Sequence, residues 1–264
     1  MDLYKKKDEK KFFMINYSKI DDFYKYLNRY EEYEELISPE KLRGDLKDFQ
    51  NLFALDFILN HYPKGANLLE IGGGDCKMLS ALLKKHPQKY KCWSLDPLLG
   101  AGGGLLFDDI LQQKKINPKI TLIKQVIGDF SEDVPNNFFD CVFSISVLEH
   151  IPIDLWGRSF KDMRRSLKVD GGKTFHCIDV PIDSEISKKR YEFVNNIENE
   201  KVGFKKYNDI NMQIKYSLKD PQTYFVSPIT YFGWLKYMNE NKDSKEEQRC
   251  YARITSINCV FKVS

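Results

Sequence analysis

A carboxylate followed by three glycines gives the first indication of chemistry in this chain. Residues 68–79 read LLEIGGGDCKML, in which Glu70 stands two positions before Gly72, Gly73 and Gly74. A glycine cluster directly after a short apolar run is typical of a backbone that must approach a ligand very closely. Because a carboxylate precedes the glycines, the ligand is expected to bring a positive charge to this point.

Two classes of cofactor compete for such a loop. A dinucleotide site has the pattern G-x-G-x-x-G, with a pyrophosphate resting on the following helix N-terminus. Lys77 stands where the third glycine would be, and Glu70 would repel a pyrophosphate. A cofactor with a positively charged amine suits these residues better, while a nicotinamide-dependent oxidoreductase stays open as the alternative.

The sequence resembles the class I S-adenosylmethionine-dependent methyltransferases over residues 45–180. Their first motif is present as Glu70-Ile71-Gly72-Gly73-Gly74, although Cys76 stands where the family often has a further glycine. Asp96, 22 residues after Gly74, matches the acid at the end of the second strand. The stretches GDF at 128–130, FDCVFSISVLEHIP at 139–152 and LKVDGG at 167–172 follow in the family's order.

The resemblance implies a set of contacts to S-adenosylmethionine, which becomes S-adenosylhomocysteine. Asp96 would bind the two ribose hydroxyls, Asp129 the adenine amino group, and Phe130 would cover the adenine ring. Ser144, at the end of the fourth strand, is also assigned to the cofactor site. Glu70 and the three glycines complete this set.

Two residues after the fourth strand are candidates for catalysis. His150 follows that strand, and an imidazole can accept a proton from a hydroxyl acceptor near neutral pH. Glu149 stands beside it, and a purely structural role for this pair at the strand–loop junction stays open. Asp154, His176 and Asp179 have no recognised metal-ligand spacing, so a core or rim role is favoured and no metal is predicted.

The methyl acceptor is expected to be a small molecule, a sugar or a glycan precursor. The stretch Ser144-Ile145-Ser146-Val147 lacks the Asn/Asp-Pro-Pro-aromatic pattern of enzymes that methylate base amino groups. Transfer to oxygen is favoured over nitrogen or carbon, and tailoring of a bacterial surface glycan is one hypothesis. A non-catalytic partner subunit stays open, whereas an aminopropyl transferase would need paired acids after the fourth strand.

Composition narrows the classes of partner. Lys and Arg total 41 and Asp and Glu 38, which leaves a net charge of +3 and argues against a nucleic-acid partner. No apolar stretch reaches about 18 residues, so neither a membrane span nor a signal peptide is expected, and the predicted location is cytoplasmic. The 6 cysteines show no CxxC spacing and are expected to be buried thiols. Nothing in the sequence indicates the oligomeric state.

Strand-like and helix-like segments alternate, which predicts a Rossmann-like, doubly wound α/β fold. We expect a mostly parallel, seven-stranded sheet with helices on both faces. The expected strands are 67–71, 90–96, 120–129, 139–148 and 173–180, followed by one or two strands in the tail at 250–264. The expected helices are 45–61, 77–86, 105–115, 154–167 and 227–241. The expected organisation is an N-terminal helical cap (1–44), a cofactor-binding core (45–182), an insertion or lid (183–226) and closing elements (227–264).

Overall fold

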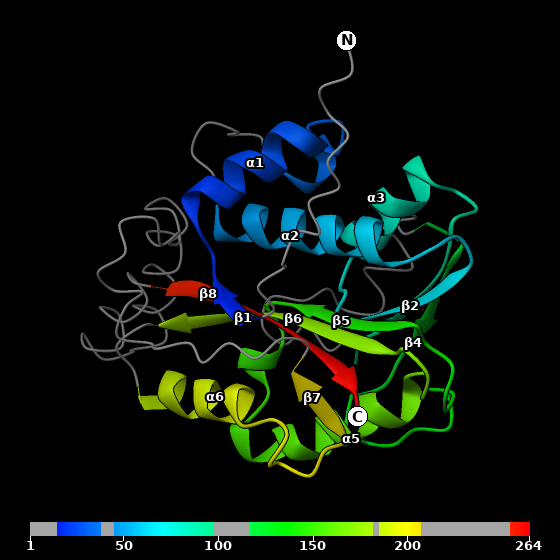
Figure 1. Cartoon of the computed structure of the whole chain (residues 1–264). Helices are drawn as coiled ribbons and strands as arrows, with labels where there is room; N and C mark the ends of the chain where they lie inside the picture. The colour runs from blue at the N-terminus through cyan, green and yellow to red at the C-terminus, as the bar shows by residue number, and fades with distance from the viewer. Residues whose placement is uncertain (1–14, 38–44, 98–116, 182–184, 207–253) are drawn as a thin grey trace, which may run out of the picture.

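The computed structural model of the chain describes residues 15–37, 45–97, 117–181, 185–206 and 254–264. In them a β-sheet lies between two layers of helices (Figure 1). The strands are β1 (Ile15–Tyr17), β2 (Ala66–Ile71), β3 (Tyr90–Leu95), β4 (Ile120–Ile123), β5 (Cys141–Ile145), β6 (Lys173–Pro181), β7 (Phe204–Lys206) and β8 (Ile254–Val263). The helices are α1 (Ile20–Tyr30), α2 (Leu46–His61), α3 (Lys77–Lys85), α5 (Trp156–Ser166) and α6 (Glu185–Asn195). Short 3₁₀ turns are η1 (Glu34–Leu36), η3 (Leu148–His150) and η4 (Ile153–Leu155).

The strand order is β1-β8-β6-β5-β2-β3-β4, with β7 also paired to β8. Strands β2 to β6 are parallel, while β8 runs antiparallel to β6, β1 and β7. This architecture confirms the predicted doubly wound, mostly parallel sheet. The chain order reverses at β2, which has β3 on one side and β5 on the other, and ligands of such sheets bind outside the carboxyl ends at this point.

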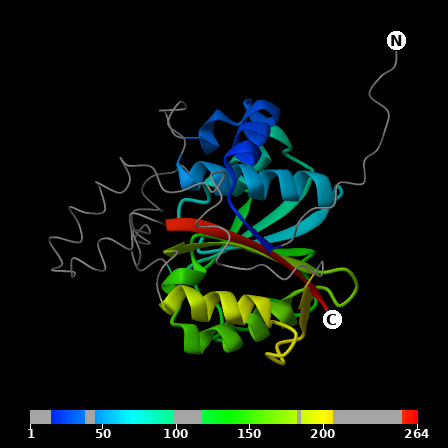
Figure 2. The same ribbon diagram turned by 60° about the vertical axis from the view of Figure 1, so that its left-hand side comes forward.

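Helices α1, α2 and α3 cover one face of the sheet, and α5 and α6 cover the other (Figures 1 and 2). On the first face Phe53 and Phe57 of α2 pack against Phe175 of β6. On the second face Trp156 and Phe160 of α5 are fully buried. Burial from both sides explains why β5, in the middle of the sheet, consists of five buried residues.

Helix α2 begins where the sequence predicts, because Asp45 caps it. The Asp45 side chain accepts a hydrogen bond from the backbone N–H of Leu46, and Asp48 accepts one from the backbone N–H of Asp45. This reciprocal capping box satisfies backbone donors that the first turn of a helix leaves open. The cap also fixes the helix end that carries Lys47 and Gln50 toward the carboxyl edge of the sheet.

Three expectations about the sheet were wrong in detail. Strand β1 lies in the segment expected to be only helical, and β7 lies in the expected insertion, yet both pair with β8. Short strands that pair through backbone alone leave little trace in the pattern of side chains. The third predicted strand, 120–129, ends at Ile123, because the chain then enters the turn at Gly128, whose φ is +101°.

Several other expectations fall on residues outside the described ranges. These are the helices at 105–115 and 227–241, and Cys250. The five cysteines inside the described ranges are buried and free of disulfides. None of the helices in the described part of the chain has the length and apolar character of a membrane span.

The capping box gives a test of the fold. Asp45→Ala removes the acceptor at the start of α2 and should lower the free energy of unfolding by about 1 kcal/mol. Urea denaturation measures this change. Asp170→Ala, which removes an exposed carboxylate in a turn, serves as the control and should stay within about 0.5 kcal/mol of the wild type. Equal stability of both variants would show that the cap contributes nothing.

Candidate active site

The sequence-predicted site residues converge on one edge of the sheet because their strands are parallel. Strands β2, β3, β5 and β6 pair in parallel register, so their carboxyl ends lie side by side. The glycine loop follows β2 and Asp96 follows β3, while Glu149 and His150 follow β5. The edge therefore has a cofactor side around β2 and β3, and a second side around β5 and β6.

Close packing requires the first two glycines of the loop. Gly72 has a φ of +66°, and a Cβ there would lie 2.5 Å from the Val147 side chain. A Cβ on Gly73 would lie 2.5 Å from Ser94 Oγ and 3.2 Å from the Glu70 carboxyl. Any side chain at either position would separate the loop from the strand ends beside it.

Glu70 lies beneath this loop with an unused hydrogen-bond acceptor. Its side chain is buried and its Oε2 atom has no hydrogen-bond partner. Burial raises the pKa of the carboxyl to about 8, with Lys47 opposing the rise and Asp75 and Asp96 adding to it. A buried, unsatisfied carboxyl next to an exposed backbone loop suits a cationic amine, the group that the sequence resemblance implies.

Asp96 connects the loop to β3. Its Oδ2 atom accepts a hydrogen bond of 3.0 Å from the backbone N–H of Gly74, which is the third glycine. The half-buried carboxylate thus holds the loop in place at the point where the resemblance puts the ribose. A carboxylate can accept several hydrogen bonds, and paired hydroxyls are suitable donors.

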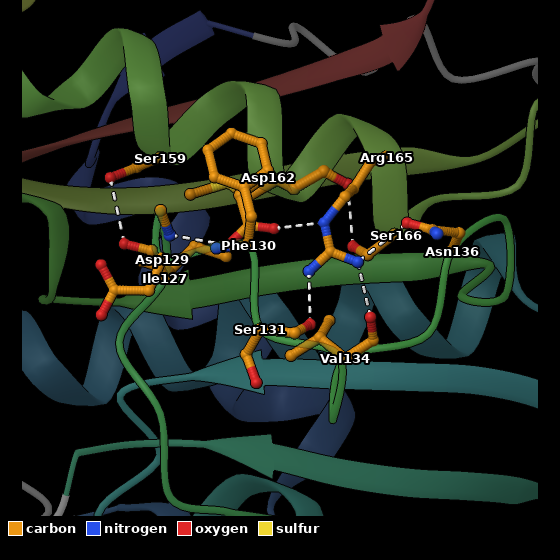
Figure 3. Close-up of polar contacts among 12 residues, drawn as sticks. Ile127, Asp129, Phe130, Ser131, Val134, Asn136, Ser159, Asp162, Arg165 and Ser166 are labelled. Atoms are coloured by element: carbon orange, nitrogen blue, oxygen red, sulfur yellow. Dashed lines mark hydrogen bonds and ion pairs between the residues drawn. The ribbon is translucent and has the colours of Figure 1, made fainter.

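The turn with Asp129 and Phe130 is anchored by a residue that sequence reasoning missed (Figure 3). Asp162 of α5 is buried, and its Oδ2 atom accepts hydrogen bonds from the backbone N–H groups of Gly128, at 2.7 Å, and Phe130, at 3.2 Å. Arg165 donates from Nε to the other carboxylate oxygen of Asp162 at 2.7 Å. The turn is therefore fixed to the rigid helix rather than left as a free loop.

Arg165 extends this anchor further along the chain. Its guanidinium donates to the carbonyl oxygens of Ser131, at 2.8 Å, and Val134, at 2.6 Å. The anchored turn leaves Asp129 exposed, and Phe130 is 43% exposed with the guanidinium groups of Arg158 and Arg165 near its ring. Both side chains thus remain accessible, as the resemblance requires for contact with an adenine.

Ser144 has a different environment from the other predicted cofactor residues. It is fully buried in β5, and its Oγ lies 2.8 Å from Nδ1 of His176 on β6. The other ring nitrogen of His176 lies 2.7 Å from Thr174 Oγ1, and burial lowers the pKa of this histidine to about 3. His176 is therefore neutral and has both ring nitrogens paired with hydroxyl groups inside the sheet. Among the described residues no three potential ligands lie close enough to hold a metal ion.

His150 and Glu149 lie on the second side of the edge, in η3. The His150 side chain is 58% exposed, whereas that of Glu149 is 9% exposed, and His150 Nε2 lies 4.0 Å from Glu149 Oε1. Burial lowers the pKa of His150, and the charges of Arg190 and Lys47 lower it further. Burial and the neighbouring Asp179 raise the pKa of Glu149 well above its usual range.

A polar network around Asp179 connects residues on the second side of the edge, around β5 and β6, and the sequence did not predict it. Ser146, with a φ of +52°, donates to Gln50 Oε1 at 2.6 Å, and Gln50 Nε2 donates to Asp179 Oδ1 at 2.6 Å. Gln50 is a fully buried amide in a helix whose buried residues are mostly apolar, which is the signal that could have identified it. Lys47 donates to the carbonyl oxygen of Ile145 at 2.9 Å. The network ties α2 to the ends of β5 and β6.

Comparison with known families identifies the kind of protein. A family described as "Methyltransferase domain" matches residues 40–205, which is more than half of the chain. The chain belongs to this family. It therefore contains a methyltransferase domain of class I fold, and the sequence resemblance that this match supports implies S-adenosylmethionine as the cofactor. This family membership argues against the alternative that the sequence left open, a nicotinamide-dependent oxidoreductase.

Solved structures agree with this fold. A phosphoethanolamine N-methyltransferase from Haemonchus contortus, in complex with S-adenosylmethionine, is 20% identical with a TM-score of 0.53; the match covers 90% of this chain but only 59% of that protein. A Galdieria sulphuraria protein, provisionally described as a sarcosine dimethylglycine methyltransferase, is 13% identical with a TM-score of 0.53, covering 81% of this chain and 84% of that protein. No curated protein matches the sequence.

The residues of the edge fit the cofactor of this methyltransferase family. Glu70 would offer a buried acceptor to an amine, Asp96 a carboxylate to hydroxyls, and Phe130 an exposed aromatic surface to a base. When bound, S-adenosylmethionine supplies a methyl group that is already activated on a sulfonium. The chain's own residues then have to hold both reactants and manage the proton.

Asp96 gives a direct test of the cofactor side. Asp96→Ala should weaken the binding of S-adenosylhomocysteine by about 1.5–3 kcal/mol, the range for hydrogen bonds to a charged group. Isothermal titration calorimetry measures the affinity, and circular dichroism checks that the variant is folded. Asp75→Ala, on an exposed residue of the same loop, should have a much smaller effect. Unchanged affinity in folded Asp96→Ala would remove this residue from the site.

The raised pKa of Glu70 predicts a pH dependence of cofactor binding. In the free protein most of the carboxyl is protonated below its pKa of about 8, and a bound ammonium favours the ionised form. Affinity for S-adenosylhomocysteine should therefore increase from pH 6 to 8, by at most about tenfold per unit. Calorimetry across this range measures the trend. Glu70→Gln should flatten it, and the same slope in that variant would contradict the assignment.

Proposed function

We propose that this methyltransferase methylates a hydroxyl oxygen of a small molecule, a sugar or a glycan precursor, with His150 as general base. The observation that supports this best is an exposed imidazole at the carboxyl edge, with a buried carboxyl 4.0 Å from its Nε2 atom. Precursors of bacterial surface glycans are the first acceptors to test. Glu149 is included in the proposed site as the acid beside the base.

We propose that most of the rate enhancement comes from positioning the acceptor hydroxyl against the methyl group of the cofactor. In-line displacement requires the acceptor oxygen, the methyl carbon and the sulfur to lie on one line. The close approach of Gly72 to Val147 keeps the glycine loop at a fixed distance from the segment that leads to His150. Holding two reactants in such a geometry can lower the activation barrier by about 7–11 kcal/mol.

Proton removal is assigned to His150. The ring accepts the hydroxyl proton as the oxygen attacks and passes it to water after the transfer. Only the neutral imidazole can do this, and the lowered pKa keeps it neutral at pH 7. The positive charges of Lys47 and Arg190 thus favour the form of the base that the reaction uses.

Segments 1–44 and 183–226 are proposed to cover the acceptor site and contribute specificity. Within the described residues, two hydrogen bonds from one side chain support this idea. Arg190 of α6 donates to the backbone carbonyl of Glu149 at 2.5 Å and to that of Asp179 at 3.5 Å. The insertion therefore reaches the same strand ends as the proposed base.

An acceptor panel tests the function. Purified protein, S-adenosylmethionine and a set of small alcohols, monosaccharides and nucleotide sugars are assayed for release of S-adenosylhomocysteine. Turnover with a hydroxyl acceptor, with the methyl group located on oxygen by mass spectrometry, is the expected result. Cofactor binding without turnover on any acceptor would support the non-catalytic partner subunit instead, and methylation of nitrogen or carbon would overturn the assignment to oxygen.

The proposed role of His150 as general base can be tested by mutation. His150→Ala should lower kcat by about 10²–10⁴-fold and leave the affinity for S-adenosylhomocysteine nearly unchanged. His86→Ala is the matched control, because His86 hydrogen-bonds Tyr33 at the C-terminal end of α3, away from the carboxyl edge. Its kcat should stay close to that of the wild type.

The pH profile separates the base from a structural histidine. With cofactor and acceptor both saturating, the wild-type kcat should rise with pH through an ionisation below 6.5 and stay level above it, because only neutral His150 accepts the proton. A His150→Ala variant that keeps more than about a tenth of the wild-type kcat, with the same profile, would assign His150 to the strand–loop junction.

A further inference from the structure

Glu149 is a buried carboxyl whose hydrogen-bonding capacity is unused. Its side chain is 9% exposed, and no other described residue hydrogen-bonds either of its carboxylate oxygens. Buried polar groups in folded proteins almost always have partners, so an exception calls for an explanation. A ligand that donates hydrogen bonds is one such explanation, and the location beside His150 indicates which ligand.

The neighbouring cations do not neutralise this carboxyl. Lys47 donates to the backbone carbonyl of Ile145, and Arg190 donates to the backbone carbonyls of Glu149 and Asp179. Both cations lie close enough to act on the charge of Glu149, yet their hydrogen bonds to this segment go to the main chain. Both carboxyl oxygens therefore lack a hydrogen-bond partner among the described residues.

Asp179 is the second acid of the pair and is held differently. Its Oδ1 atom accepts hydrogen bonds from Gln50 and, at 3.3 Å, from Ser146, so its position is fixed by α2 and by the end of β5. Asp179 is also the neighbour that most strongly favours the protonated form of Glu149. The two acids thus differ, because hydrogen bonds hold the half-buried Asp179 whereas the carboxyl oxygens of Glu149 have no hydrogen-bond partner.

We propose that Glu149 and Asp179 bind an ammonium group of the methyl acceptor, which makes the acceptor an amino alcohol or an amino sugar. An ammonium carries three N–H donors and a positive charge, whereas a hydroxyl carries one donor and no charge. The cation satisfies the open oxygens of Glu149 and relieves the repulsion between the two carboxyls. The inference rests on the proposed function, because it takes His150 as the base for the neighbouring hydroxyl.

The geometry specifies where the amine lies relative to the reacting oxygen. His150 Nε2 and Glu149 Oε1 are 4.0 Å apart, so one small ligand contacts both atoms when its hydroxyl and amino groups stand on neighbouring carbons. A free hydroxyl then faces the base while the ammonium faces the acids. This arrangement holds the amine in its protonated form, which is not nucleophilic, and directs methylation to oxygen.

Binding of paired probes tests the proposal directly. With the protein saturated with S-adenosylhomocysteine, 2-aminoethanol is compared with ethylene glycol, and D-glucosamine with D-glucose, by calorimetry. At least one amine should bind about tenfold or more tightly than its hydroxyl counterpart, as expected for charged hydrogen bonds. Glu149→Gln should abolish the preference. Glu200→Gln, the same change on an exposed residue, should retain it.

Two further measurements keep the test decisive. Calorimetry in buffers of different ionisation enthalpy should show proton release on amine binding, because the added cation favours the ionised form of the two carboxyls. The charged or titratable groups that face the pair are Lys47, Asp45, His150 and Arg190. Glu149→Gln should melt no lower than the wild type, since it removes an unsatisfied acid. A clearly lower melting temperature would assign Glu149 to the junction and overturn the proposal.

The outcomes separate this inference from the proposed function. Equal binding of amines and hydroxyl counterparts, or binding of neither, overturns the ammonium site, whatever the acceptor panel shows. Methyl transfer to a hydroxyl acceptor without an amine would then leave the proposed function intact. Amine preference that depends on Glu149, together with no turnover on oxygen, would support the ammonium site and contradict the proposed function.

Discussion

The contact between Gly72 and Val147 fixes the relation between the two sides of this site. Gly72 follows β2 and Val147 follows β5, and these strands are direct neighbours in parallel register, with Ile71 opposite Ser144. A Cβ at position 72 would lie 2.5 Å from the valine side chain, so only glycine allows this approach. A methyl transfer depends on a short distance between donor and acceptor. The pairing of β2 with β5 fixes how far apart the segments that carry the two proposed binding sites lie.

The acids of the molecule fall into two groups that the structure treats differently. Asp162 is buried, and its carboxylate binds Arg165 and two backbone N–H groups, so it stabilises the turn before Ser131. Asp56 is buried as well. Its Oδ1 atom accepts hydrogen bonds from Arg29 and Tyr30, which attaches α1 to α2, while its Oδ2 atom has no hydrogen-bond partner. These acids are used by the fold itself.

Glu70 and Glu149 are buried at the carboxyl edge, yet they have acceptor oxygens without hydrogen-bond partners. Burial raises the pKa of both carboxyls, and the positive charge of the nearby Lys47 opposes the rise only in part. An arrangement that costs stability in the free protein is typical of sites that bind a ligand. The cofactor and the acceptor would each provide the cation that the fold leaves out.

The sequence was sufficient for the parts of this molecule that depend on local pattern. The apolar run of β5, the capped start of α2 and the glycine loop follow from neighbouring residues, and parallel pairing then brings Asp96 close to Gly74. Asp162 and Gln50 could not be assigned in this way, because their partners lie 34 and 129 residues away in the chain. The same limit explains β1, a three-residue strand that exists only because β8 pairs with it.

The positive charges of Lys47 and Arg190 near His150 have two effects: they lower the pKa of the imidazole, and they hold the main chain around it. The lowered pKa keeps the proposed base neutral. Lys47 donates to the backbone carbonyl of Ile145 at the end of β5, and Arg190 to that of Glu149 in η3. Had these cations paired with Glu149 and Asp179 instead, the acids would be ionised and satisfied, and the base would feel a weaker positive field. Because the cations hold the main chain, the acids keep their capacity for a ligand, and the strand ends that present base and acids are stiffened by the same contacts.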